Sequence, residues 1–169
     1  MADHGYELER IKTTYPEIQA DTIDETIIPG LQWLTEKYDR PIMIDDSGLF
    51  IDGLKGFPGV YSAYVFKTVG CDGILRLMEG VKNRGARFEC CIGFMVPGGK
   101  PFIARGVSKG SIPEKKEGTG GFGYDPVFIP EGYSKTFAQL EMADKNKISH
   151  RGRAIEAFLM ELPRLLPPS

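Results

Sequence analysis

The apolar side chains between residues 22 and 38 recur at the spacing of a helix. Thr22-Ile23-Asp24-Glu25 has the form of a capping box, in which two side chains accept the free backbone N–H groups of a first turn. One apolar face follows, made of Ile23, Ile27, Leu31 and Leu34. The pattern predicts a helix to about Tyr38, with a kink or a late start at Pro29-Gly30, because a proline there removes a backbone donor.

Strand-like runs account for much of the remaining chain. Residues 84–96 and 100–111 are two long runs around Pro97-Gly98-Gly99, a pattern that predicts a β-hairpin. Shorter strand signals cover Tyr6 to Thr14, broken by Tyr15-Pro16, and Pro126 to Ile129. The hairpin implies an antiparallel pair in a sheet that we expect to be otherwise mixed.

Two further helices follow from the same kind of pattern. Apolar residues from Ile74 to Met78 indicate a short helix that closes at Gly80. Ser149 is a good N-cap for a last helix that ends near Pro163. Its apolar residues are Ala154, Ile155, Phe158, Leu159 and Leu162. Helices interspersed with strands favour an α/β fold.

The stretch Pro41 to Phe50 is the strongest candidate for a functional site. Four mostly β-favouring residues run into Asp45 and Asp46 and then into Ser47-Gly48, which predicts a buried strand that ends at a polar rim. Paired carboxylates at such a place can hold a divalent metal or act as a base. The alternative is an Asx-type turn, in which the carboxylates accept backbone N–H groups.

Composition narrows the function classes. A chain of 169 residues, 41% apolar, predicts one domain over residues 1–169 with a core of its own. The net charge of −2 excludes an overall basic field for nucleic acid or anionic lipid, so we expect a small ligand and neither of these partners. Three cysteines form no disulfide framework, and the N-terminus has no apolar signal region, which predicts a reducing cytoplasm.

A glycine-rich stretch from Gly118 to Asp125 is a second candidate site. It has neither the Walker A pattern nor the dinucleotide-binding spacing, so it is either a flexible loop or a loop whose backbone approaches a ligand while Phe122 or Tyr124 offers a ring for stacking. Downstream, His150 and Arg151 fall in the first turn of the last helix. Cations there oppose the helix dipole, which suggests a phosphate, although a solvated basic face is the ordinary explanation.

Five motifs, taken in order, strongly resemble the inosine triphosphate pyrophosphatase family. Each is weak alone, but together they run from about Ile11 to Leu162. They are Tyr15-Pro16-Glu17-Ile18-Gln19, Asp45-Asp46-Ser47-Gly48-Leu49, Phe57-Pro58-Gly59-Val60-Tyr61-Ser62, Gly120-Gly121-Phe122-Gly123-Tyr124-Asp125-Pro126 and Ser149-His150-Arg151-Gly152.

The resemblance implies a fold, a reaction and a set of site residues. The fold is an elongated α/β fold with a mixed sheet, flanking helices and two lobes around a nucleotide cleft, usually as a homodimer. The reaction is Mg²⁺-dependent hydrolysis of ITP, dITP or XTP to the monophosphate and diphosphate. Glu17 and Asp46 match the metal-associated acids, and Asp46 also matches the catalytic base. The substrate-binding positions are Ser47, the base-binding loop Phe122, Gly123, Tyr124 and Asp125, and then Lys145, His150 and Arg151.

The chain departs from this family at its N-terminus. Members open with a strand that ends in a Ser/Thr-x-Asn-x-x-Lys phosphate loop, and nothing between Met1 and Arg10 resembles it. We therefore expect a chain that starts about two dozen residues late and lacks a phosphate-binding lysine. Ala63-Tyr64 also stands where some relatives carry a basic residue after the Phe-Pro-Gly motif.

Three other functions compete with this interpretation. An acyl hydrolase would use Ser47, His150 and an aspartate, but Ser47 lacks the Gly-x-Ser-x-Gly elbow. A catalytically weak or inactive nucleotide-binding protein would fit the missing loop. A Maf-like pyrophosphatase would act on modified pyrimidine nucleotides instead of purines.

Overall fold

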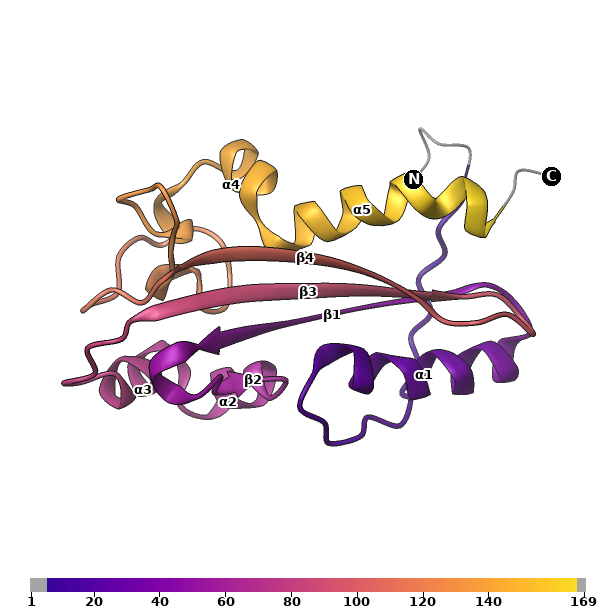
Figure 1. Ribbon diagram of the computed structural model, residues 1–169, viewed down its shortest axis with the longest axis horizontal. Helices are drawn as coiled ribbons and strands as arrows, with labels where there is room; N and C mark the ends of the chain where they lie inside the picture. Colours follow the sequence, from indigo (N-terminus) through magenta and orange to yellow (C-terminus); the bar gives the residue numbers. More distant parts are fainter. Residues whose placement is uncertain (1–5, 167–169) are drawn as a thin grey trace.

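The computed structural model describes residues 6–166, which form a long sheet with helices on both faces (Figure 1). The strands are β1 (Ile42–Ile51), β2 (Pro58–Gly59), β3 (Gly85–Met95), β4 (Phe102–Ser111) and β5 (Ile129–Pro130). The helices are α1 (Ile23–Tyr38), α2 (Ser62–Thr68), α3 (Gly70–Leu77), α4 (Met142–Ile148) and α5 (His150–Leu165). Short 3-10 turns cover Asp52–Leu54, Asp125–Val127 and Phe137–Gln139.

The sheet has the order β2-β1-β3-β4-β5, and each of these pairings is antiparallel. The predicted α/β class and the β3–β4 hairpin are confirmed. The parallel pairing that a mixed sheet would contain does not occur among residues 6–166. β2 pairs only with Leu49 and Phe50, and no other strand of the described chain lies along that edge of β1.

β1 is longer than the sequence indicated, and it carries the candidate acids in its middle. It pairs with β3 without interruption from Ile42 opposite Met95 to Ile51 opposite Ala86. The predicted strand end at Asp45 and the turn at Ser47-Gly48 are therefore wrong, because ten residues of ladder hydrogen bonds hold the backbone extended through them. Side chains alternate along a strand, so Asp45 and Asp46 point to opposite faces.

α1 covers one face of the sheet and α5 the other (Figure 1). The α1 face contains Ile27, Leu31 and the β1 residue Ile44, and the α5 face contains Phe158 against Phe94, with ring centroids 5.6 Å apart. A third cluster at the far end of the sheet includes Phe88, Phe128 and Phe137. These three clusters fix both helices and the loop before α4 against the sheet.

Glycines allow both helices to lie close to the strands. A Cβ atom on Gly93 of β3 would come within 2.4 Å of the Ile27 side chain in α1. A Cβ atom on Gly106 of β4 would come within 2.0 Å of the backbone oxygen of His150. Gly106 therefore lets the first turn of α5 rest directly on β4, which fixes the position of His150 and Arg151.

Helix boundaries follow the sequence signals at their starts more closely than at their ends. The carboxylate of Glu25 accepts the backbone N–H of Thr22 at 3.2 Å, so the predicted capping box starts α1. The Ser149 hydroxyl accepts the backbone N–H of Gly152 at 3.1 Å and caps α5 as predicted. α1 continues through Pro29, and α5 passes Pro163 to Leu165, because the buried faces of both helices hold them on the sheet.

Two predicted strands are wrong or displaced. Residues 6–14 contain no strand; Tyr6 instead donates its hydroxyl to the Leu166 carbonyl at 2.7 Å, and Glu9 pairs with Arg40 at 2.8 Å. These side-chain contacts hold the segment against the rest of the fold, and its backbone pairs with no strand of the described chain. The strand predicted from Pro126 to Ile129 begins later, at Ile129–Pro130, because a 3-10 turn occupies Asp125–Val127.

No helix in the described part of the chain is long and apolar enough to cross a membrane.

Candidate functional site

Glu17 and Asp46 line one small pocket, which we call the acid pocket. It has a volume of about 180 Å³. Its lining is Tyr15, Glu17, Ile18, Gln19, Thr26, Asp46, Val60 and Tyr61. The two acids come from the loop before α1 and from β1, 29 positions apart in the sequence numbering (46 − 17). The structure thus brings together the two residues that the motifs singled out as metal-associated.

Asp46 is held in place and its charge is partly desolvated. The backbone N–H of Ser47 donates to Asp46 Oδ1 at 2.8 Å, and the Thr26 hydroxyl lies 3.4 Å from Oδ2. Burial raises the pKa of Asp46, and the negative charges of Glu17 and Asp45 raise it further, while the two hydrogen bonds act in the opposite direction. A carboxylate with a raised pKa is a stronger base, as proton abstraction from water requires.

The donor set of the acid pocket fits Mg²⁺. No group of three or more His, Cys, Asp or Glu side chains within residues 6–166 is arranged as a metal cage. Mg²⁺ is usually held by one or two carboxylates, with water and substrate phosphates filling its octahedron. Glu17 and Asp46 supply such a pair, and the cluster of negative charge around them favours a cation.

Phe122, Asp125, Lys145 and Arg151 form a second group, which we call the Phe122 cluster. The Asp125 carboxylate is buried, accepts the backbone N–H of Phe122 at 2.8 Å and pairs with Lys145 Nζ. The Lys145 ammonium lies 4.5 Å from the centroid of the Phe122 ring, and the Arg151 guanidinium lies 5.7 Å from it. Phe122 is 62% exposed, which leaves its ring accessible for stacking on a planar ligand.

The glycine-rich loop has a defined conformation in this structure. Gly121 has φ +69°, and a Cβ atom there would lie 2.0 Å from Asp125 Oδ2, so only glycine fits beside the carboxylate. Gly123 has φ +59°, and its carbonyl accepts the Cys71 thiol at 3.5 Å. Of the two rings that the sequence offered for stacking, Tyr124 is buried and donates its hydroxyl to the Ser62 carbonyl at 2.8 Å.

β1 joins the two parts of the candidate site. Asp46 points into the acid pocket, and its neighbour Asp45 pairs with Arg151 of the Phe122 cluster, with 3.1 Å between Oδ2 and the guanidinium. Ser47 follows on the same side of the strand as Asp45, opposite Cys90 of β3. Because Asp45 and Asp46 point to opposite faces, the acid pocket and the Phe122 cluster lie on opposite sides of β1 and are linked through this strand.

Residues 2–161 match the Ham1 family. The chain belongs to the Ham1 family. It is 53% identical over 158 residues to the dITP/XTP pyrophosphatase of Pyrococcus horikoshii, covering 94% of this chain and 84% of that protein. It is 51% identical over 154 residues to the dITP/XTP pyrophosphatase of Thermococcus kodakarensis, covering 91% and 83%.

Solved structures agree with this membership. The Ham1-family chain matches the Staphylococcus aureus Ham1 protein with a TM-score of 0.83 and 31% identity, over 89% of this chain and 80% of that one. It matches a HAM1 protein from Coxiella burnetii with a TM-score of 0.80 and 32% identity, over 89% and 82%. The α/β fold of this family, expected from the five motifs, is thereby confirmed.

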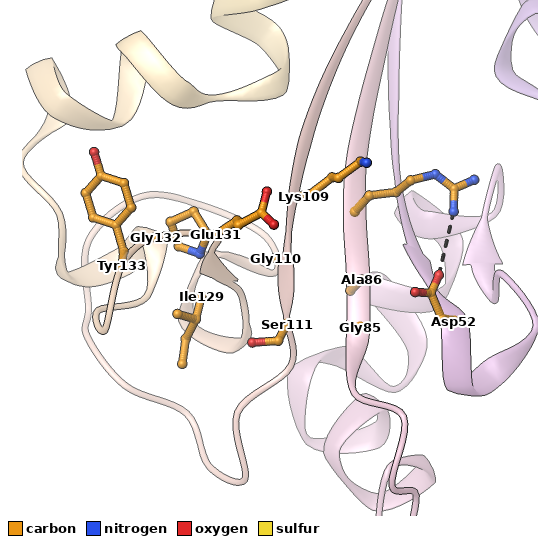
Figure 2. Close-up of a pocket in the computed structure, with 12 residues that line it drawn as sticks. Asp52, Gly85, Ala86, Lys109, Gly110, Ser111, Ile129, Glu131, Gly132 and Tyr133 are labelled. Carbon is orange, nitrogen blue, oxygen red and sulfur yellow. Dashed lines mark ion pairs between the residues drawn. The ribbon is translucent and has the colours of Figure 1, made fainter.

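A larger pocket of about 600 Å³ lies elsewhere in this Ham1-family protein (Figure 2). It lies between the ends of β3 and β4 and the segment from Ile129 to Tyr133. Its two cations, Arg87 and Lys109, are matched by the acids Asp52 and Glu131, and Arg87 pairs with Asp52 at 3.9 Å. None of the site residues predicted from the sequence lines it, so the size of a pocket does not locate the chemistry here.

His150 differs from its predicted role as a cation. It is 6% exposed and stacks on Phe88, with ring centroids 4.6 Å apart. Burial lowers its pKa to about 3, and the charges of Arg151 and Lys145 act in the same direction. His150 is therefore neutral at pH 7, and Arg151 alone carries positive charge at these two positions of α5.

We expect His150 to make the fold sensitive to mild acid. Its pKa is about 3 when folded and about 6.5 when unfolded, so the unfolded chain binds the extra proton and stability falls as the pH drops from about 6.5 toward 3. At about pH 4.5 the loss should be on the order of 2 kcal/mol relative to pH 7. Urea unfolding of the parent and of His150→Gln at both values measures it. Parallel pH dependence in the two proteins would contradict the assignment.

Several residues of the site carried no usable sequence signal. Thr26 contacts Asp46 only because α1 packs beside β1. Ser62 joins the glycine-rich loop to β1, because it accepts the Leu49 N–H on its hydroxyl and the Tyr124 hydroxyl on its carbonyl. Tyr15 could be suspected from its place in the Tyr-Pro-Glu motif, but its contact with the acid pocket required the structure.

Proposed function

We propose that this protein is a Mg²⁺-dependent pyrophosphatase that hydrolyses ITP, dITP or XTP to the monophosphate and diphosphate. The observation that carries the proposal is the acid pocket of Glu17 and Asp46, joined through Asp45 to the Phe122 cluster. Related proteins named dITP/XTP pyrophosphatase, 53% and 51% identical, support it. We further infer that residues 1–169 form one domain, that two copies form a homodimer, and that the enzyme works in the cytoplasm.

Both acids share one task in this chemistry, and Asp46 has a second. Glu17 and Asp46 would hold Mg²⁺, which when bound neutralises charge on the phosphate oxygens. Asp46 takes a proton from water as the water oxygen bonds to the α-phosphorus. The bond from that phosphorus to the bridging oxygen breaks, and diphosphate leaves with the electron pair. The raised pKa of Asp46 favours this proton transfer.

Selectivity follows from hydrogen-bond polarity at the base. Hypoxanthine and xanthine present an acceptor at O6 and a donor at N1, whereas adenine presents the reverse. The base stacks on the exposed Phe122 ring, and Arg151, beside that ring, donates to O6. An adenine amino group would face this donor, and leaving a buried polar group unpaired costs about 1–3 kcal/mol. Neutral, buried His150 contributes no charge to this recognition.

Lys145 has a different task from a free phosphate-binding cation. Its ammonium is paired with buried Asp125 and lies over the Phe122 ring. It therefore orders the loop on which the base stacks, and it adds positive charge near the ring without projecting into solvent. Phosphate neutralisation then depends mainly on the metal.

Diphosphate release from purified protein tests the proposal. With Mg²⁺ present, we expect ITP and XTP to be hydrolysed about 100-fold more efficiently than ATP, and a chelator to abolish the reaction. Equal turnover of ATP would contradict the assigned selectivity. Turnover of pyrimidine triphosphates with ITP untouched would favour the Maf-like alternative, and ITP binding without hydrolysis would favour a non-catalytic nucleotide-binding protein.

A further inference from the structure

Gly30 stands at an unusual place for a glycine. It lies in the middle of the 16-residue helix α1, directly after Pro29, and it is buried. Proline and glycine are the two least favourable residues in a helix interior. The positive φ angles that favour glycine occur at other positions and not at Gly30. The backbone conformation of α1 therefore does not explain why residue 30 lacks a side chain.

The ring of Tyr15 explains why residue 30 has no side chain. A Cβ atom built on Gly30 would lie 2.6 Å from Tyr15 Cδ2 and 2.7 Å from Cε2, closer than real Cβ atoms approach other atoms. The Ile44 methyl of β1 lies 3.3 Å from the same point. Tyr15 is thus packed where α1 and β1 meet, in space that any larger residue at position 30 would take.

This packing places Tyr15 at the acid pocket. Tyr15 lines the pocket together with Glu17 and Asp46. Its ring fills the space between α1 and β1 at this point, and Glu17 follows it by two residues in the chain. The position of the Glu17 carboxylate therefore depends on where the ring is packed.

We propose that Tyr15 is a positioning residue of the acid pocket, and that residue 30 is glycine to make room for its ring. The ring anchors the chain two residues before Glu17 and so sets where the Glu17 carboxylate lies. Partners of this kind orient the groups that bind a metal, and their loss usually lowers activity without removing the site. The positioning role rests on the proposed function, whereas the packing explanation of Gly30 does not.

Tyr15→Ala tests the positioning role, and Tyr15→Phe is its matched control because it keeps the ring and its packing. We expect Tyr15→Ala to lower kcat for ITP about 10- to 100-fold, and Tyr15→Phe to keep kcat near that of the parent. Both are measured well below the thermal midpoint of each variant, so that a loss of stability alone does not lower kcat. A Tyr15→Ala protein with the parent kcat, or a Tyr15→Phe protein as impaired as Tyr15→Ala, would overturn the role of the ring.

Gly30→Ala tests the packing with a readout that needs no activity. Alanine favours a helix, yet we expect Gly30→Ala to lower the thermal midpoint and kcat because the new methyl group displaces Tyr15. In a Tyr15→Ala background the space is free, so the same substitution should raise the midpoint by about 2–4 °C. An equal effect of Gly30→Ala in both backgrounds would overturn the packing explanation.

The two kinds of failure are separable. If the parent hydrolyses ITP while Tyr15→Ala is unimpaired, the proposed function stands and the inference about Tyr15 is wrong. If the parent hydrolyses neither ITP nor XTP, the proposed function is wrong and the positioning role falls with it. The thermal cycle of Tyr15 and Gly30 decides the packing explanation in either case.

Discussion

Asp46→Asn should lower the rate of diphosphate release from ITP by about 10²- to 10⁴-fold, the range typical for loss of a general base. Asparagine has nearly the same shape but cannot accept a proton from water or neutralise a cation. Burial penalises the charged form of Asp46, so the neutral amide should leave the thermal midpoint unchanged or raise it. Steady-state kinetics together with thermal unfolding separate this loss from a loss of folding.

Asp144→Asn is the matched control for this experiment. Asp144 is an exposed acid of α4, paired with Lys147 at 3.7 Å, and it takes no part in the acid pocket. The substitution removes the same charge and should leave the rate near that of the parent. If Asp46→Asn keeps the parent rate, Asp46 is not the base and the mechanism assigned to the acid pocket is wrong.

Lys145→Met should destabilise the fold by about 3–5 kcal/mol, because it leaves the Asp125 carboxylate buried without a partner. The Asp125 side chain is 3% exposed and that of Lys145 is 12% exposed, so little water can replace the lost ion pair. For a chain of this size the loss corresponds to a drop of roughly 10 °C in the thermal midpoint. Calorimetry or urea unfolding at neutral pH measures it.

The neighbouring ion pair provides the control. Lys147→Met removes the same charge from the same helix, but Lys147 and Asp144 have side chains 76% and 60% exposed. We expect a change within about 0.5 kcal/mol there. Adding Asp125→Asn to Lys145→Met removes the unpaired charge and should restore part of the stability. Equal effects of Lys145→Met and Lys147→Met would show that the Asp125 pair does not hold the loop.

The sequence correctly predicted those parts of the fold that are formed by residues close together in the chain. The capping box at Thr22 and the Pro97-Gly98-Gly99 turn are formed within a few residues, so the start of α1 and the β3–β4 hairpin were correctly predicted. The extended backbone through Asp45 and Asp46 depends on β3, which lies far along the chain. Polar residues inside a strand are interpreted as its end unless the partner strand is known.

For the candidate site too, the sequence predicted the residues but not the properties that depend on the assembled fold. The motifs identified Glu17, Asp46 and the Phe122 loop, because their residue types and order are visible in the sequence. The neutral state of His150 depends on its stacking against Phe88, and the task of Lys145 depends on the burial of Asp125. Burial is a property of the assembled fold, so a sequence shows which groups can titrate but not which of them remain charged.

The edge of β1 beyond its short pairing with β2 has a consequence for solubility. Strand edges without a partner are templates on which a second chain can add a strand, and proteins commonly protect such edges with charged side chains. Asp45 and Asp46 lie on this part of β1, so two copies brought together there would place like charges beside one another. Asp46, which we assign to catalysis, thus also opposes aggregation together with Asp45, and variants that neutralise both should precipitate at lower protein concentration than the parent.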